Sequence, residues 1–179
     1  MGIPMFTPAV QRIVWKEFRA QRAIWFGIAF ELVILQLFKA FSPEKFPINL
    51  VSLACVLTGI FAMTSSALLF AGESEAQTDG FLRQLPFRSR ELILGKLGFN
   101  IAAVASFLAF SLLAAKLISG IGTGGRMQAG DYEEAVAYAN SVLGLWAWGI
   151  FYSLLTRKVM WTLLGAALTE IVVNTALHG

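Results

Sequence analysis

The stretch GESEAQTDGFLRQLPFRSRELILGK, residues 72–96, decides the fold, because it is the long polar interruption between strongly apolar blocks. Its first half carries acidic side chains and its second half carries basic ones. Thr78, Phe81, Leu82 and Leu85 recur at the i, i+3, i+4, i+7 spacing of a single helix face. We therefore expect a short amphipathic helix that connects two membrane spans and serves as a docking element for a partner.

Composition places the flanking blocks in a membrane. Of 179 residues, 57% are hydrophobic and 14% are charged, and the mean hydropathy is +0.69, whereas a soluble chain is about a quarter charged. The apolar blocks approach the roughly 20 residues that an α-helix needs to cross the hydrocarbon core. They lack the alternating segments of about ten residues that form membrane β-strands. The fold class is therefore an all-α integral membrane protein.

Several chemistries find no support in the sequence. The basic residues lie at the ends of apolar blocks, so the pI near 9.2 reflects membrane topology and not nucleic-acid binding. The single cysteine, Cys55, lies in an apolar run, and His178 has no partner for a metal site. The glycines at 120–125 precede Arg126 and Met127, not the Lys-Ser/Thr pair of a phosphate loop. We expect neither a catalytic site nor a cofactor in this chain.

The apolar pattern predicts one transmembrane domain covering residues 1–179. An amphipathic interfacial helix is expected at about 8–22, introduced by Thr7 and Pro8 as N-cap and first helical residue. The expected spans are 23–41, 48–71, 91–118, 132–156 and 159–177, with the polar loop at 72–90. Ser89 is expected to cap the third span, and Asp131 is expected to begin the fourth. Small residues spaced by four predict a packing face on the third span: Gly98, Ala102 and Ser106.

Charge predicts the orientation. With the N-terminus in the cytoplasm, ten basic residues fall inside: Arg12, Lys16, Arg19, Arg22, Arg83, Arg88, Arg90, Lys96, Arg157 and Lys158. Four fall outside: Lys39, Lys45, Lys116 and Arg126. This positive-inside bias predicts a multi-pass protein of the cytoplasmic (inner) membrane, with the loop at 72–90 in the cytoplasm.

Polar residues within the spans have two interpretations. An ionised acid at a helix centre costs roughly 2.5–3.5 kcal/mol on insertion scales, so Glu31 must be protonated, paired or turned toward a cavity. It could line a translocation path together with Gln36, or it could hydrogen-bond Gln36, Asn100 or a serine. Glu170 and Asn174, spaced by four in the last span, pose the same alternative, and there a structural role is favoured.

The polar loop resembles a known family. Glu73, Glu75 and Thr78, followed by Phe81-Leu82 and Leu85-Pro86, and then by Ser89-Arg90, Ile93 and Gly95-Lys96, resemble the cytoplasmic loop between spans two and three of type-2 ATP-binding-cassette (ABC) exporter permeases. Residues 14–19 resemble the connecting helix that precedes the first span in that family. The resemblance runs from about residue 10 to residue 118.

The resemblance implies a permease subunit that lacks its own ATPase site. A separate ABC ATPase subunit would bind ATP and magnesium, and two permeases would pair as a homodimer or heterodimer. The segment at about 74–85 would be the coupling helix, docking on the ATPase through Glu73, Glu75, Thr78, Phe81, Leu82, Leu85 and Arg90. Members of the family usually have six spans, so the five expected here imply a truncated permease or its N-terminal portion. The cargo stays open, and so does the alternative of a membrane scaffold or assembly protein that recruits another cytoplasmic partner through the same loop.

Overall fold

A computed structural model describes residues 8–41, 49–75, 89–120, 129–156 and 158–178. Over these ranges the chain forms five helices, which confirms the all-α prediction. Their bounds are α1 (Pro8–Phe41), α2 (Leu50–Glu75), α4 (Ser89–Ser119), α5 (Ala129–Leu155) and α6 (Val159–His178). The bounds of α2, α4, α5 and α6 differ from those of the expected spans by at most four residues, because apolar runs bounded by polar residues set where helices begin and end.

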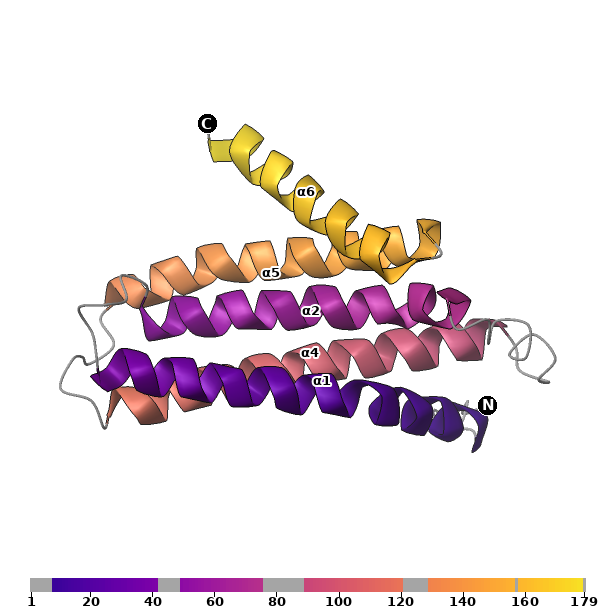
Figure 1. Cartoon of the computed structure of the whole chain (residues 1–179), viewed down its shortest axis with the longest axis horizontal. Helices are drawn as coiled ribbons and strands as arrows, with labels where there is room; N and C mark the ends of the chain where they lie inside the picture. The colour runs from indigo at the N-terminus through magenta and orange to yellow at the C-terminus, as the bar shows by residue number, and fades with distance from the viewer. Residues whose placement is uncertain (1–7, 42–48, 76–88, 121–128, 157, 179) are drawn as a thin grey trace, which may run out of the picture.

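Four of the helices run side by side, antiparallel to their chain neighbours, and α6 crosses them obliquely (Figure 1). The centre of the row is α2, with α1 and α4 on one side and α5 and then α6 on the other. The beginnings of α1 and α4, the end of α2 and the α5–α6 turn share one end of the bundle (Figure 1). We call this the 76–88 end, after the segment that joins α2 to α4 there.

Three of the helices are long and apolar enough to cross a membrane: Gln11–Phe41, Leu50–Ala71 and Leu92–Ser119. In α6 a shorter apolar stretch, Val159–Val173, is described. The structure therefore supports a helical membrane protein, with three of the five expected spans meeting this criterion. The spans assigned to α5 and α6 stay predictions.

Two helix beginnings refine the sequence analysis. The interfacial helix and the first span are one continuous helix, α1, which begins at Pro8 as expected for a proline at the first helical position. Thr7 lies outside the described residues. Helix α5 begins at Ala129, two residues before the expected start near Asp131, which lies within the first turn.

An aromatic core joins α1, α2 and α4. The ring of Phe61 in α2 stacks on that of Phe107 in α4 at a centroid distance of 4.7 Å. Trp25 of α1 meets the Phe107 ring edge-on at 5.6 Å, and Ala29 and Leu32 complete the buried cluster. Because such pairs add to the stabilisation from buried area, these three helices form one packed unit.

Close helix packing through small residues occurs at α2 and α5. A Cβ added at Gly149 of α5 would collide with the Ser66 side chain of α2, and one added at Gly59 would lie 3.1 Å from Leu145. The packing face predicted at Gly98, Ala102 and Ser106 forms no close helix contact among the described residues, where all three are exposed. A Cβ at Gly98 would meet no atom within 4 Å.

Candidate functional site

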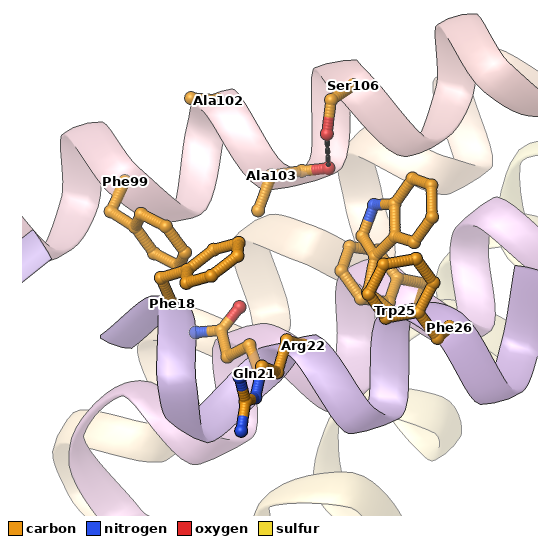
Figure 2. Close-up of a pocket in the computed structure, with 10 residues that line it drawn as sticks. Phe18, Gln21, Arg22, Trp25, Phe26, Phe99, Ala102, Ala103 and Ser106 are labelled. Carbon is orange, nitrogen blue, oxygen red and sulfur yellow. Dashed lines mark hydrogen bonds between the residues drawn. The ribbon is translucent and has the colours of Figure 1, made fainter. Parts of the chain in front are cut away.

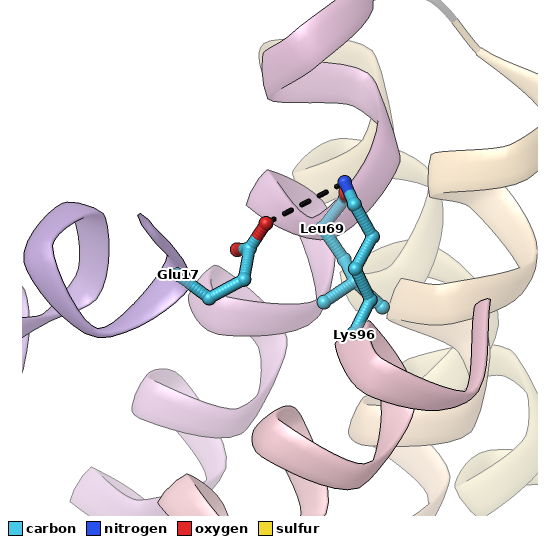
Figure 3. A network of polar contacts seen from close by, with 3 residues as sticks. All are labelled: Glu17, Leu69 and Lys96. Atoms are coloured by element: carbon cyan, nitrogen blue, oxygen red, sulfur yellow. Dashed lines mark hydrogen bonds and ion pairs between the residues drawn. The ribbon is translucent and has the colours of Figure 1, made fainter. Parts of the chain in front are cut away.

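A buried charge cluster ties three helices together near the 76–88 end. The Lys96 ammonium of α4 lies 3.6 Å from a Glu17 carboxylate oxygen of α1 and donates a 2.6 Å hydrogen bond to the Leu69 carbonyl of α2 (Figure 3). It also lies 5.3 Å from the centroid of the Phe70 ring, within cation–π range. We call Glu17, Leu69 and Lys96 the three-helix clamp.

The clamp is shielded from solvent. Lys96 is 1% exposed and Glu17 is 5% exposed. Removing one partner of a buried ion pair costs about 3–5 kcal/mol, because the other charge is left uncompensated. The pair therefore fixes the position of α1 relative to α4, while the hydrogen bond to Leu69 adds α2.

The clamp lies close to both ends of the 76–88 segment. Leu69 is six residues before the end of α2 at Glu75, and Lys96 is seven residues after the beginning of α4 at Ser89. At 1.5 Å per residue each separation is about 10 Å. A displacement of either helix end is thus expected to reach α1 through a short, rigid path.

One turn further along the same helices lie two more buried polar residues. Gln21 follows Glu17 by four residues in α1, and Asn100 follows Lys96 by four in α4. The Asn100 side-chain oxygen accepts a 2.7 Å hydrogen bond from the Trp146 indole of α5. The Asn100 amide nitrogen and both Gln21 amide atoms have no hydrogen-bond partner among the described residues.

A third polar contact binds α1, α2 and α4 beyond the aromatic core. The Gln36 amide donates to the Ser111 carbonyl at 3.4 Å, and the hydroxyls of Thr58 and Ser111 are 3.0 Å apart. Each hydroxyl also lies within hydrogen-bond distance of a carbonyl of its own helix, so one of them donates to that carbonyl while the other donates across the helices. Gln36 is fully buried there, in a contact that joins helices.

The polar residues expected along a translocation path are dispersed in this chain. Glu31 is exposed on α1, and its expected partners Gln36 and Asn100 bond Ser111 and Trp146 instead. Glu170 is buried between α6 and α5, with its carboxylate packed over Gly144. Asn174 lies in α6. Because α1 and α6 lie on opposite sides of the row (Figure 1), Glu31 and Glu170 lie in separate parts of the described bundle.

The predicted docking residues lie at the edge of what the structure describes. Glu73 and Glu75 belong to the last turn of α2, and Arg90 is the second residue of α4. Thr78, Phe81, Leu82 and Leu85 are outside the described residues. The coupling helix therefore remains a prediction, and the structure contributes the positions from which the segment leaves and returns.

Sequence reasoning missed the clamp, although two signals for it are present. The pairs Glu17/Gln21 and Lys96/Asn100 place two polar residues on one face at i, i+4 spacing. In the sequence alone, Lys96 is a topology charge and part of the Gly95-Lys96 motif, and Glu17 belongs to the 14–19 block that resembles a connecting helix. Their complementary charges in facing helices could have suggested the contact.

The clustered carboxylates and nitrogens do not form a metal site in the described part of the chain, where no group of three His, Cys, Asp or Glu side chains comes together. The chemistry available is electrostatic clamping and hydrogen bonding.

Comparison with family models, curated proteins and solved structures finds no match to this chain, so the family resemblance of the 72–96 stretch depends on its residues alone.

Proposed function

We propose that this chain is the membrane-spanning permease subunit of an ABC exporter. It would couple ATP hydrolysis by a separate ATPase subunit to outward transport. The 72–90 loop would be the element that receives force from that subunit. The observation that carries the proposal is the three-helix clamp, because it joins α1, α2 and α4 about 10 Å from Glu75 and Ser89, the helix ends that flank the 76–88 segment.

Force transmission requires a stiff connection between the loop and the spans. Two helix ends that leave the bundle separately could move locally, and such motion would not reach the rest of the molecule. The clamp and the Phe61–Phe107 stack oppose independent movement, since packed cores and interfaces shift between discrete arrangements. A push on the loop would thus move α1, α2 and α4 together. This stiffness supports a coupling role for the loop over that of a passive tether.

The test is co-purification with an ABC ATPase subunit, with candidates taken from the genes that neighbour the one encoding this chain. The double change Phe81→Asp with Leu82→Asp places two charges on the apolar face of the expected helix, and co-purification should be lost. The matched control, Gln77→Asp with Gln84→Asp, adds the same charge away from that face and should leave co-purification intact. Association that survives the first change contradicts the proposal.

A second measurement separates the permease from a scaffold. In proteoliposomes, the permease should change the rate of ATP hydrolysis by the bound subunit. Glu17→Gln, which weakens the clamp, should reduce that change while co-purification persists. A chain that binds the subunit but leaves its hydrolysis rate unaltered would instead be a recruiting scaffold.

A further inference from the structure

A groove opens between α1 and α4 on the side of α1 that faces α4 (Figure 2). Its volume is about 470 Å³, within the roughly 300–1,000 Å³ of small-molecule sites. The walls are mostly aromatic and aliphatic: Phe18, Trp25, Phe61, Phe99, Ala102 and Ala103. The groove lies between two helices that are long and apolar enough to span a membrane, so an amphiphile dissolved in the bilayer is a suitable class of occupant.

A single buried amide faces this apolar groove. Gln21 is 3% exposed, and its carboxamide points into the space between α1 and α4, beside Phe18 (Figure 2). Neither its nitrogen nor its oxygen has a hydrogen-bond partner among the described residues. Ser106, on the opposite wall, donates its hydroxyl to the Ala103 carbonyl at 2.8 Å. Since an unpaired buried amide is costly, the groove holds a polar anchor that its own walls leave unsatisfied.

Water is a poor partner for this amide. An ordered buried water normally makes about three hydrogen bonds, and here the facing walls are aromatic rings and alanines. A ligand hydroxyl is better suited, because it donates to the Gln21 oxygen and accepts from the nitrogen while its apolar body covers the rings.

The head group should be neutral. The nearest cation that lines the groove is Arg22, and its guanidinium is directed away from α4 (Figure 2). A phosphate or carboxylate placed at Gln21 would be desolvated without a facing positive charge, and burying an unpaired charge is far more costly than burying a hydroxyl.

We propose that the α1–α4 groove is a binding site for a neutral, hydroxyl-bearing single-chain amphiphile of the monoacylglycerol type. Its hydroxyl bonds Gln21, and its chain lies along Phe18, Trp25 and Phe99. Occupancy of the groove does not depend on the exporter function, because every contact belongs to this chain.

The probe is a monoacylglycerol with a brominated acyl chain, titrated into nanodiscs that contain the purified full chain without any ATP-binding subunit. Bromine quenches tryptophan fluorescence on contact, and Trp25 lines the groove. We expect a saturable quenching component that disappears in Trp25→Phe, which removes the reporter but keeps an aromatic wall. Absence of that component would overturn the proposal.

Variants test the polar anchor and the groove separately. Gln21→Leu removes both hydrogen bonds and should weaken monoacylglycerol binding roughly five- to 150-fold. The variant should then bind monoacylglycerol no more tightly than a chain-matched brominated methyl ester. Ala102→Trp should block the groove, whereas Ala105→Trp, an exposed position of α4 outside the lining, should not. Equal affinity for alcohol and ester in the unmodified chain would indicate non-specific lipid contact. Tighter binding of a chain-matched lysophosphatidylglycerol would show that the site prefers an anionic head. Either result overturns the proposal.

Discussion

At the scale of single residues, Lys96 combines burial with charge to an unusual degree. It is a lysine with 1% exposure in a helix long and apolar enough to cross a membrane. Its ammonium is retained there because three groups from two other helices surround it: the Glu17 carboxylate, the Leu69 carbonyl and the Phe70 ring. Such pairs contribute little net stability compared with apolar packing but specify one arrangement of helices.

Lys96→Met should therefore destabilise the protein by about 3–5 kcal/mol, because Glu17 is left buried without its cation. Cys55 is a buried thiol, so a thiol-reactive dye reports unfolding in detergent, and Tm should fall. Lys116→Met, at an exposed position of the same helix, should change stability by less than about 0.5 kcal/mol.

A double-mutant cycle of Glu17 and Lys96 tests whether the two charges interact. Removing both charges, Glu17→Met with Lys96→Met, should restore much of the lost stability, since no uncompensated charge remains. A double variant as unstable as the sum of the two single variants would show that the charges do not interact.

At the scale of helices, α2 is the element around which the others are arranged. It packs against α1, α4, α5 and α6, and its contact with α5 depends on small residues. Without a hydrophobic driving force between helices in lipid, close approach of backbones is a main source of association. Gly59 and Ser66 of α2 and Gly149 of α5 provide that approach.

Gly149→Val should disrupt the α2–α5 contact, because its side chain would overlap Ser66. Overpacking of this kind costs about 1–3 kcal/mol, and the dye-monitored Tm should fall. Gly98→Val is the matched control: nothing lies within 4 Å of that Cβ, and the higher helix propensity of valine should leave Tm unchanged or slightly raised. Equal losses at both positions would mean that the closeness of α2 and α5 contributes no stability.

At the scale of the whole molecule, the alternation of the helices brings distant segments to one end of the bundle. The beginnings of α1 and α4, the end of α2 and the α5–α6 turn all lie at the 76–88 end (Figure 1). Ten of the fourteen basic residues belong to these segments or to the chain between α2 and α4, so one membrane orientation satisfies the positive-inside rule for all of them together.

Accessibility labelling tests that orientation. In a Cys55→Ala background, a cysteine introduced at Gln84 should react with a membrane-impermeant maleimide only in inverted vesicles, and one introduced at Thr123 only in intact cells. The excess of basic residues at the 76–88 end is the physical reason. Labelling of the Gln84 cysteine in intact cells would place the loop outside and remove the basis for docking a cytoplasmic ATPase.

The helices themselves were predictable from the sequence, and so was their alternation. In lipid every backbone amide must be bonded within its own segment, so a long apolar run such as 50–71 becomes a helix whatever its neighbours are. The bounds of α2 and α4 follow from polar residues at their ends. The start of α5 was less well predicted, because the capping signal at Asp131 lies inside a helix that begins earlier.

Which helix faces touch was decided by tertiary structure alone. The sequence identified Gly98, Ala102 and Ser106 as a packing face, but small residues recur often in membrane helices, and the close contact forms at Gly59 and Gly149. The pairing of Glu17 with Lys96 and the open groove beside Gln21 likewise depend on how α1 rotates against α4. Hydropathy determines that a segment enters the bilayer because each segment meets the lipid separately, whereas the rotation of each helix depends on the shapes and polar groups of all its neighbours at once.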